Sequence, residues 1–223
     1  MSKSKNENNV VFETLINIFT VEKGKLKILL VRKKDEPYKG YWTLPNKIIT
    51  NEETLEDGIN LILQEQIGLN EIYHEQDYTF SSINRNPNER IIGTSYIGLT
   101  DSKTIEIKRE KKDEIETKWF LINEIPKMAY DHKEIIEKSI EKLKTKLVNS
   151  NVLKSLFPSD FTLPELQNIY ESILNTTLDR RNFRKKFISL GLIEDTGYKN
   201  EGGNGRPAKL YKFKENIKEI NLF

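Results

Sequence analysis

The sequence contains no cysteine and only two histidines, His74 and His132. Without cysteine the chain has no disulfide framework, thiolate metal site, iron–sulfur cluster or cysteine nucleophile. Two imidazoles also argue against a multi-histidine metal centre or a catalytic triad. No stretch approaches the roughly 18 apolar residues that a membrane-spanning helix needs, and the N-terminus is polar. We therefore expect a soluble, cytoplasmic protein with no membrane partner.

The composition is that of a folded chain with room for two domains. The 223 residues are 36% hydrophobic and include 10 Phe and 9 Tyr, which is enough apolar material for packed cores. We expect a first domain over residues 9–148 and a second over residues 152–216. The short polar segment 148–151 is the expected linker.

Strands interrupted by helices are expected in the first domain, which favours a mixed α/β architecture. A polar turn containing Gly24 joins two apolar runs into a hairpin. Apolar residues at helical spacing, followed by Gly68, predict a helix of about three turns, and a longer charged helix precedes the linker. The expected strands are 10–20, 26–32, 78–81, 90–100, 103–107 and 117–121, and the expected helices are 54–66 and 131–147.

The second domain has the pattern of a winged helix-turn-helix. Thr162 and Glu165 form a capping box that starts one helix, and Asp179 is the N-cap candidate of the next. That second helix, 180–190, places aromatic residues on one face and cations on the other. Two short strands then flank the turn-rich basic segment 196–209, which predicts a wing.

Positive charge is concentrated in this second domain. The whole chain carries a net charge of only +2. Between Asn175 and Lys214, however, ten cations stand against four anions, a local net charge of +6. A locally basic module on a near-neutral body is typical of proteins that contact nucleic acid, although a solvated lysine-rich surface gives the same pattern.

The segment 44–69 resembles the signature of Nudix hydrolases, in which helix glutamates hold Mg²⁺ against a diphosphate. The register rests on five matches, with Leu44 and Pro45 in front of them as the family commonly has. The matching residues are Glu53, Leu63, Glu65, Gly68 and Leu69. The resemblance implies a Nudix-like α/β/α sandwich with a mixed sheet.

The departures from the signature fall on its chemistry within the degenerate box 47–69. Lys47 stands where the signature has glycine, and Leu61 where it has arginine. Ile62 and Gln66 replace two of the three helix glutamates, which leaves Glu65 alone. A divalent cation held by one carboxylate and one amide is weakly bound. We therefore expect no catalytic residues, no metal site, no cofactor and no hydrolase activity.

A Nudix-like domain followed by a winged helix resembles the Nudix-related transcriptional regulator (NrtR) family over nearly the whole chain. The segments LFPSDFTLPELQNIYESIL, LDRRNFRKKFISLGLIEDTG and GRPAKLYKF are similar to the family's helix, recognition helix and wing. The resemblance implies a homodimeric repressor of operator DNA. Its Nudix-like domain would sense a small effector, such as ADP-ribose, a related nucleotide or a sugar, to control a metabolic operon.

In this setting the basic helix becomes a recognition helix, whose cations can reach guanine edges or phosphates. Asn182 fits pairing with adenine and fits equally a capping or solvent-facing role. The residues that we assign to DNA are Arg180, Arg181, Asn182, Arg184, Lys185, Arg206 and Lys209, the last two in the wing on phosphates.

The effector residues are expected at the mouth of the sheet, where cations can hold phosphates. Trp42 fits stacking on a flat ligand but fits core packing better. Lys47 could neutralise a phosphate or could equally face solvent. His132 could cap a helix or contact the other domain. The residues that we assign to the effector are Arg32, Lys33, Trp42, Lys47, Arg85 and Arg90.

Two other function classes compete with the repressor. An active Nudix pyrophosphatase with an added nucleic-acid module would need the carboxylates that Ile62 and Gln66 replace. An RNA-associated adaptor would need exposed aromatic residues for stacking, whereas Phe183 and Phe187 have the spacing of core residues.

Overall fold

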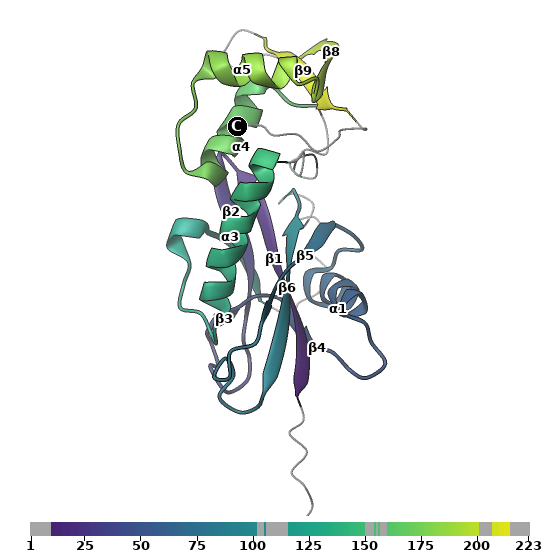
Figure 1. The fold of residues 1–223 in the computed structure, drawn as a ribbon, viewed down its shortest axis with the longest axis vertical. Helices are drawn as coiled ribbons and strands as arrows, with labels where there is room; N and C mark the ends of the chain where they lie inside the picture. The colour runs from purple at the N-terminus through teal and green to yellow at the C-terminus, as the bar shows by residue number, and fades with distance from the viewer. Residues whose placement is uncertain are drawn as a thin grey trace, which may run out of the picture.

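The computed structural model describes residues 10–101, 105, 116–149, 154, 156, 160–200 and 207–214. The first domain is a sheet between helices, and the second domain sits on one end of it (Figure 1). The strands are β1 Val11–Glu22, β2 Lys25–Arg32, β3 Trp42–Thr43, β4 Asn46–Ile48, β5 Tyr73–Phe80, β6 Ile91–Leu99, β7 Thr117–Leu121, β8 Ile193–Lys199 and β9 Lys209–Phe213. The helices are α1 Leu55–Leu61, η1 Ile62–Ile67, η3 Ile122–Glu124, α3 His132–Asn149, α4 Leu163–Leu174 and α5 Arg180–Ser189.

Strand β1 is the centre of the large sheet. The order is β3-β2-β1-β6-β5, with β4 paired to β1 and β7 paired to β2. The β1–β6 pair is parallel and the other pairs are antiparallel, so the sheet is mixed. Eight consecutive residues of β1 are buried, which fits a strand covered on both faces. Helices α1 and α3 lie on opposite faces (Figure 1), which confirms the expected sandwich.

Helix α1 differs in detail from the single α-helix expected over residues 54–66. Thr54 caps it in a capping box with Asp57, and the α-helical turns end at Leu61. The segment then continues as a π-helix through Ile67 and closes at Gly68, whose φ is +77°. A wider turn of this kind accommodates an extra residue without ending the helix, and such turns are frequent at functional sites.

One strand prediction differs from the structure for a physical reason, and another falls almost entirely outside the described residues. Strand β5 begins at Tyr73, well before the expected residue 78. It is an edge strand whose first five residues are all polar or aromatic, so they lack the apolar alternation that marks a buried strand. The expected strand 103–107 lies outside the described residues except for the buried Ile105. The helix before the linker extends two residues further than expected, to Asn149.

The second domain is the expected winged helix. Thr162 caps α4 with the predicted box, and Asp179 accepts a hydrogen bond from the backbone N–H of Asn182 at the start of α5. Tyr170, Phe183 and Phe187 pack as a buried aromatic cluster with ring centroids 4.5–5.5 Å apart. Strands β8 and β9 form the antiparallel wing.

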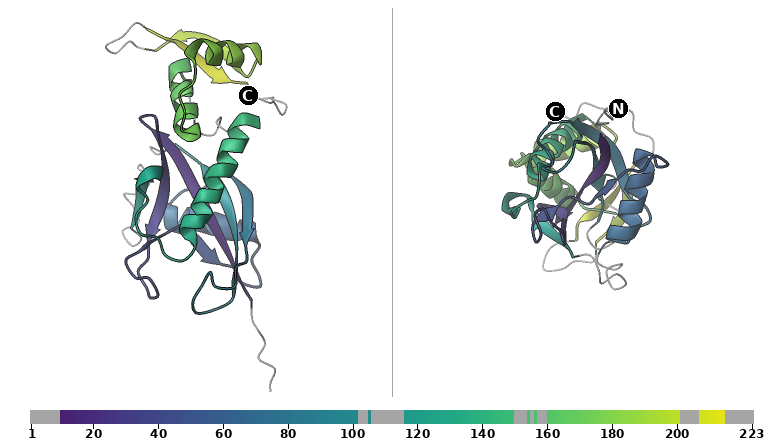
Figure 2. Two further views of the ribbon diagram at one scale, coloured as in Figure 1. Left: turned by 60° about the vertical axis from the view of Figure 1, so that its left-hand side comes forward. Right: turned by 90° about the horizontal axis from the view of Figure 1, so that it is seen from below.

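The two domains share one hydrophobic core. Leu26 and Ile28 of β2 and Leu147 of α3 belong to the same buried cluster as Leu166 and Tyr170 of α4. Helix α3 crosses one face of the sheet and runs toward the winged helix (Figure 2). Within the described residues, no helix is long and apolar enough to cross a membrane.

Candidate functional site

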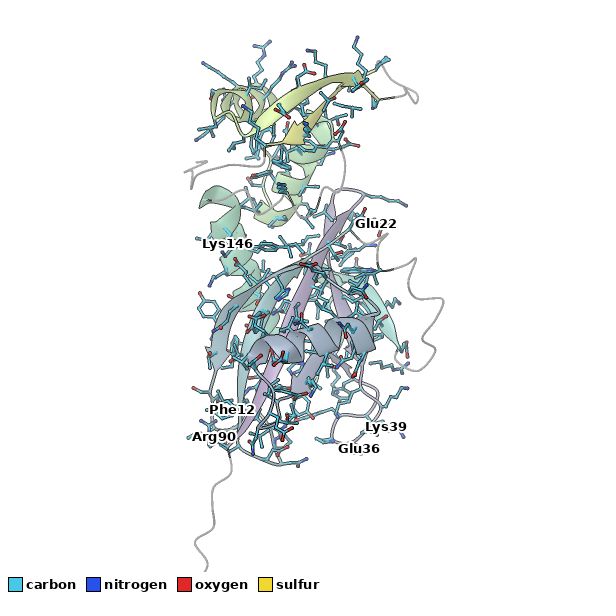
Figure 3. All side chains as sticks on the ribbon, turned by 90° about the vertical axis from the view of Figure 1, so that its right-hand side faces the viewer. Phe12, Glu22, Glu36, Lys39, Arg90 and Lys146 are labelled. Carbon is cyan, nitrogen blue, oxygen red and sulfur yellow. The ribbon has the colours of Figure 1, made fainter. Side chains whose placement is uncertain are left out.

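A cavity of about 390 Å³ opens at one end of the sheet. The loop after β2, the loop before β6 and the start of α3 meet there. Figure 3 labels Glu36 and Arg90, which flank these loops, at the end of the sheet farthest from the winged helix. Cations on the cavity wall, Arg32, Lys33 and Arg85, make this end of the sheet suitable for an anionic ligand.

Arg85 is the buried cation of this cavity, with 6% of its surface exposed. Its Nε and Nη2 donate to the two carboxylate oxygens of Asp131 at 2.9 and 3.1 Å, and its Nη1 donates to Glu13 at 2.9 Å. Gly93 makes room for the guanidinium, because a Cβ there would lie 2.7 Å from Nη1. A larger residue than glycine at position 93 would therefore displace Arg85.

The pKa values in this cluster follow from burial and pairing. Burial raises the pKa of Glu13 above its usual value, and the Arg85 guanidinium only partly opposes this shift. Burial acts to lower the pKa of Arg85, but the hydrogen bonds and charges of Asp131 and Glu13 outweigh it and raise the pKa. The arginine therefore remains charged between its two carboxyl groups.

His132 forms part of the cavity wall and is uncharged. The backbone N–H of Leu44 donates to its Nδ1 at 3.0 Å, so the ring proton of the neutral form resides on Nε2. Burial lowers the pKa of His132 to about 3, and the nearby charges of Arg85 and Lys33 act in the same direction. The ring is therefore a fixed hydrogen-bond donor over the whole physiological pH range.

The residues of the degenerate box are used for structure. Lys47 pairs with Glu53 at 2.8 Å, and the side-chain amide of Gln66 donates to the backbone carbonyl of Asn46 at 2.7 Å. Ile62 is fully buried in the core beneath the sheet. In the part of the chain that the structure describes, no three His, Asp or Glu side chains are grouped as a metal site requires.

The structure brings together half of the predicted effector residues. Arg32, Lys33 and Arg85 line the cavity. Trp42 instead packs edge-on against Phe120, with ring centroids 4.7 Å apart, which is the core packing that its sequence context fits better. Lys47 is held in its ion pair with Glu53, and Arg90 donates to the backbone carbonyls of Ser81 and Ser82. None of these last three lines the cavity.

Sequence reasoning missed several residues of the cavity wall. Glu13 is hidden within an apolar strand, and Asn46 and Tyr130 carry no signal in the sequence. His132 is the first residue of a helix, where a capping role is also expected. The one available signal was that His132 is one of only two histidines and stands beside an acid.

The recognition helix α5 exposes the predicted basic face. Its cations and Asn182 point away from the aromatic core and are solvent-exposed: Arg180, Arg181, Asn182, Arg184 and Lys185. In the wing, Lys209 forms an ion pair with Asp195 at 2.6 Å, which raises the pKa of Lys209. Arg206 lies outside the described residues.

Comparison with known proteins agrees with both halves of this arrangement. A family model described as "NUDIX domain" matches residues 14–139, and one described as "NrtR DNA-binding winged helix domain" matches residues 154–213. The "ADPR responsive transcriptional repressor NtrR" of Acinetobacter baylyi is 32% identical over 204 residues, which are 88% of this chain and 79% of that protein. The chain belongs to the NrtR family.

This NrtR-family chain is similar both to a regulator of known structure and to an enzyme. The crystal structure of Shewanella oneidensis NrtR with a 27mer DNA has a TM-score of 0.80 and 30% identity, covering 91% of this chain and 93% of that one. The ADP-ribose pyrophosphatase of Methanocaldococcus jannaschii is 32% identical over 111 residues, which are 50% of this chain and 64% of the enzyme.

The buried, neutral His132 predicts an acid-sensitive fold. A histidine in the unfolded chain has a pKa of about 6.5, so its ring becomes protonated below that pH. In the folded chain the ring of His132 stays neutral until the pH falls to about 3. Stability is therefore retained above pH 6.5 and lost as the pH falls. Between about pH 7.5 and about pH 5, wild type should lose about 2 kcal/mol more stability than His132→Gln in urea unfolding.

His74→Gln is the matched control for this measurement, because it removes the other histidine and leaves His132 in place. It should lose stability with acid as wild type does. Equal acid sensitivity in wild type and His132→Gln would contradict the assignment of His132 as a buried neutral residue.

Proposed function

We propose that this protein is a DNA-binding transcriptional repressor whose Nudix domain senses ADP-ribose or a closely related compound. Residues 9–148 form the sensor and residues 152–216 the DNA-binding domain, and two chains pair on a palindromic operator. The observation that carries the proposal is the position of α3. This helix starts at the arginine-lined cavity and ends at the basic winged helix.

The chemistry of the cavity supports an effector that carries phosphate. Its volume of about 390 Å³ falls within the roughly 300–1,000 Å³ of small-ligand pockets. Arg85 and the neighbouring cations can neutralise a diphosphate, and the Nε2–H of His132 can donate to an oxygen of the ligand. The Acinetobacter baylyi relative is named as ADPR responsive, which favours ADP-ribose among the phosphate-containing candidates.

The proposal predicts that effector and operator binding are coupled. An operator would be selected from a library of duplexes with the full-length chain, and its affinity measured by fluorescence anisotropy with and without ADP-ribose. Saturating ADP-ribose should weaken operator binding by about 5- to 150-fold, and operator should weaken ADP-ribose binding by the same factor. AMP is the control ligand, since it lacks the diphosphate. If ADP-ribose leaves operator affinity unchanged, the sensor role is wrong.

The exposed face of α5 generates a second prediction about DNA. Arg184→Ala combined with Lys185→Ala should weaken operator binding and reduce its dependence on salt concentration, because fewer counterions are released from the phosphates. The matched control is Lys39→Ala with Lys118→Ala, which removes two exposed cations from the sensor domain. Lys39 lies at the opposite end of the molecule from α5 (Figure 3). A salt dependence unchanged from wild type in the α5 variant would exclude this helix from the DNA surface.

We further infer that the Nudix domain has lost hydrolysis. Ile62 and Gln66 occupy two of the three glutamate positions, and both are committed to contacts within the fold. The competing pyrophosphatase role is favoured by the likeness to the Methanocaldococcus jannaschii enzyme, which spans half of this chain.

Loss of hydrolysis predicts that the purified chain releases no AMP from ADP-ribose with Mg²⁺ or Mn²⁺ present. Without the paired carboxylates a metal ion cannot be held against the diphosphate. Release of AMP would be followed by chromatography over many hours at high protein concentration. AMP release that disappears in Glu65→Gln would restore the enzyme hypothesis, because Glu65 is the one helix glutamate of the Nudix signature that this sequence keeps.

A further inference from the structure

The start of helix α3 is fastened to the wall of the effector cavity. Asp131, which immediately precedes α3, is held by the two hydrogen bonds from Arg85 at 2.9 and 3.1 Å. His132, the first residue of α3, is held by the backbone N–H of Leu44. Tyr130 has a φ of +54°, a backbone conformation that L-residues rarely adopt. The contacts of the two residues that follow Tyr130 therefore hold this strained turn in place.

Charge makes this fastening sensitive to an anionic ligand. Arg85 is a single buried cation between two carboxyl groups, so the three groups together are not positive when both acids are ionised. An anionic group arriving at Arg85 would come close to both acids, and like charges repel strongly in a buried site. Binding is more favourable when one of the two carboxylates moves away.

Of the two carboxylates, Asp131 is the one that is free to move. Glu13 lies within β1, where its neighbours in the sheet are Ile48 of β4 on one side and Gly93 of β6 on the other. Its backbone is therefore fixed by a ladder on both sides. Asp131 lies in a turn between Tyr130 and the first residue of α3, and so can shift with the end of the helix.

We propose that the anionic part of the effector competes with Asp131 for Arg85, so that an occupied cavity releases the start of α3. The inference rests on the proposed function, because it specifies how the sensor site acts on the DNA-binding domain. Arg85 is then a residue shared between two states. It holds α3 when the cavity is empty and holds the ligand when the cavity is full.

A movement at the start of α3 can be transmitted along the helix to the winged-helix domain. Along its length, Ser139 donates to Asp77 of β5 at 2.5 Å and Lys146 pairs with Glu75 at 2.6 Å. Its last turns bury Leu143 and Leu147 in the core shared with α4. A helix of 18 residues is about 27 Å long, so a tilt about these contacts displaces its far end beside α4.

Asp131→Asn in the full-length chain tests the competition. The amide keeps the shape of the side chain but removes the charge that holds Arg85. Compared with wild type, ADP-ribose should bind several-fold more tightly and operator more weakly, because the released state is already populated. The factor by which ADP-ribose weakens operator binding should fall toward one. Calorimetry gives the ADP-ribose affinity, and anisotropy gives the operator affinity.

Two further variants separate a released helix from a change in local charge. Glu13→Gln removes the other carboxylate from Arg85 but leaves Asp131 in place. It should tighten ADP-ribose binding. The factor by which ADP-ribose weakens operator binding should stay as in wild type. Glu134→Gln removes an exposed carboxylate from the first turn of α3 and should match wild type in every measurement.

The outcomes distinguish this inference from the proposed function. If wild type shows no effect of ADP-ribose on operator binding, the sensor role fails and the competition fails with it. If wild type shows the effect and Asp131→Asn, folded by near-ultraviolet circular dichroism, shows it undiminished, only the competition at Arg85 is overturned. Equal loss of the effect in Glu13→Gln and Asp131→Asn would also overturn it, because the charge of the cavity alone would then explain both.

Discussion

The buried ion pair between Arg85 and Asp131 is the contact on which the organisation of this molecule depends. It joins a loop of the first domain to the start of α3, and its arginine lines the cavity that we assign to the effector. Leaving a buried charge without its partner is costly. Neither residue can therefore lose its partner unless another group of the same charge takes the partner's place. A ligand that supplies negative charge is such a replacement for Arg85.

Two substitutions in the segment that resembles the Nudix signature contribute to the packing of this fold. Ile62, which stands where the Nudix signature has a glutamate, is fully buried in the core, and the side-chain amide of Gln66 donates a hydrogen bond to the backbone carbonyl of Asn46. Both changes stabilise the helix–loop segment without requiring an ion. Under the function that we propose, a site that binds a diphosphate without hydrolysing it would respond to the concentration of that ligand.

The shared core gives the two domains a defined relative position. Helix α4 contacts both β2 and α3, and the tip of the β1–β2 hairpin at Gly24 reaches Asn168 of α4. Interfaces of this kind favour a small number of discrete packings over continuous bending. A change in the orientation of α3 therefore has a direct route to the recognition helix, which a flexible linker would not provide.

The elements of this fold are largely determined by local sequence, and the effector site is not. Apolar periodicity, the capping boxes and Gly68 predict most helices and strands because they act over a few residues. They mislead at β5, where the residues that α3 covers are polar instead of apolar, and at the π-helical turn, whose hydrogen bonds are one residue wider. The cavity depends on Glu13, Arg85 and Asp131, which are brought together from distant parts of the chain. Only the pairing of β1 with β6 and the packing of α3 on the sheet decide that these charges meet, because a buried ion pair is a property of the tertiary environment and leaves no periodic signal in the sequence.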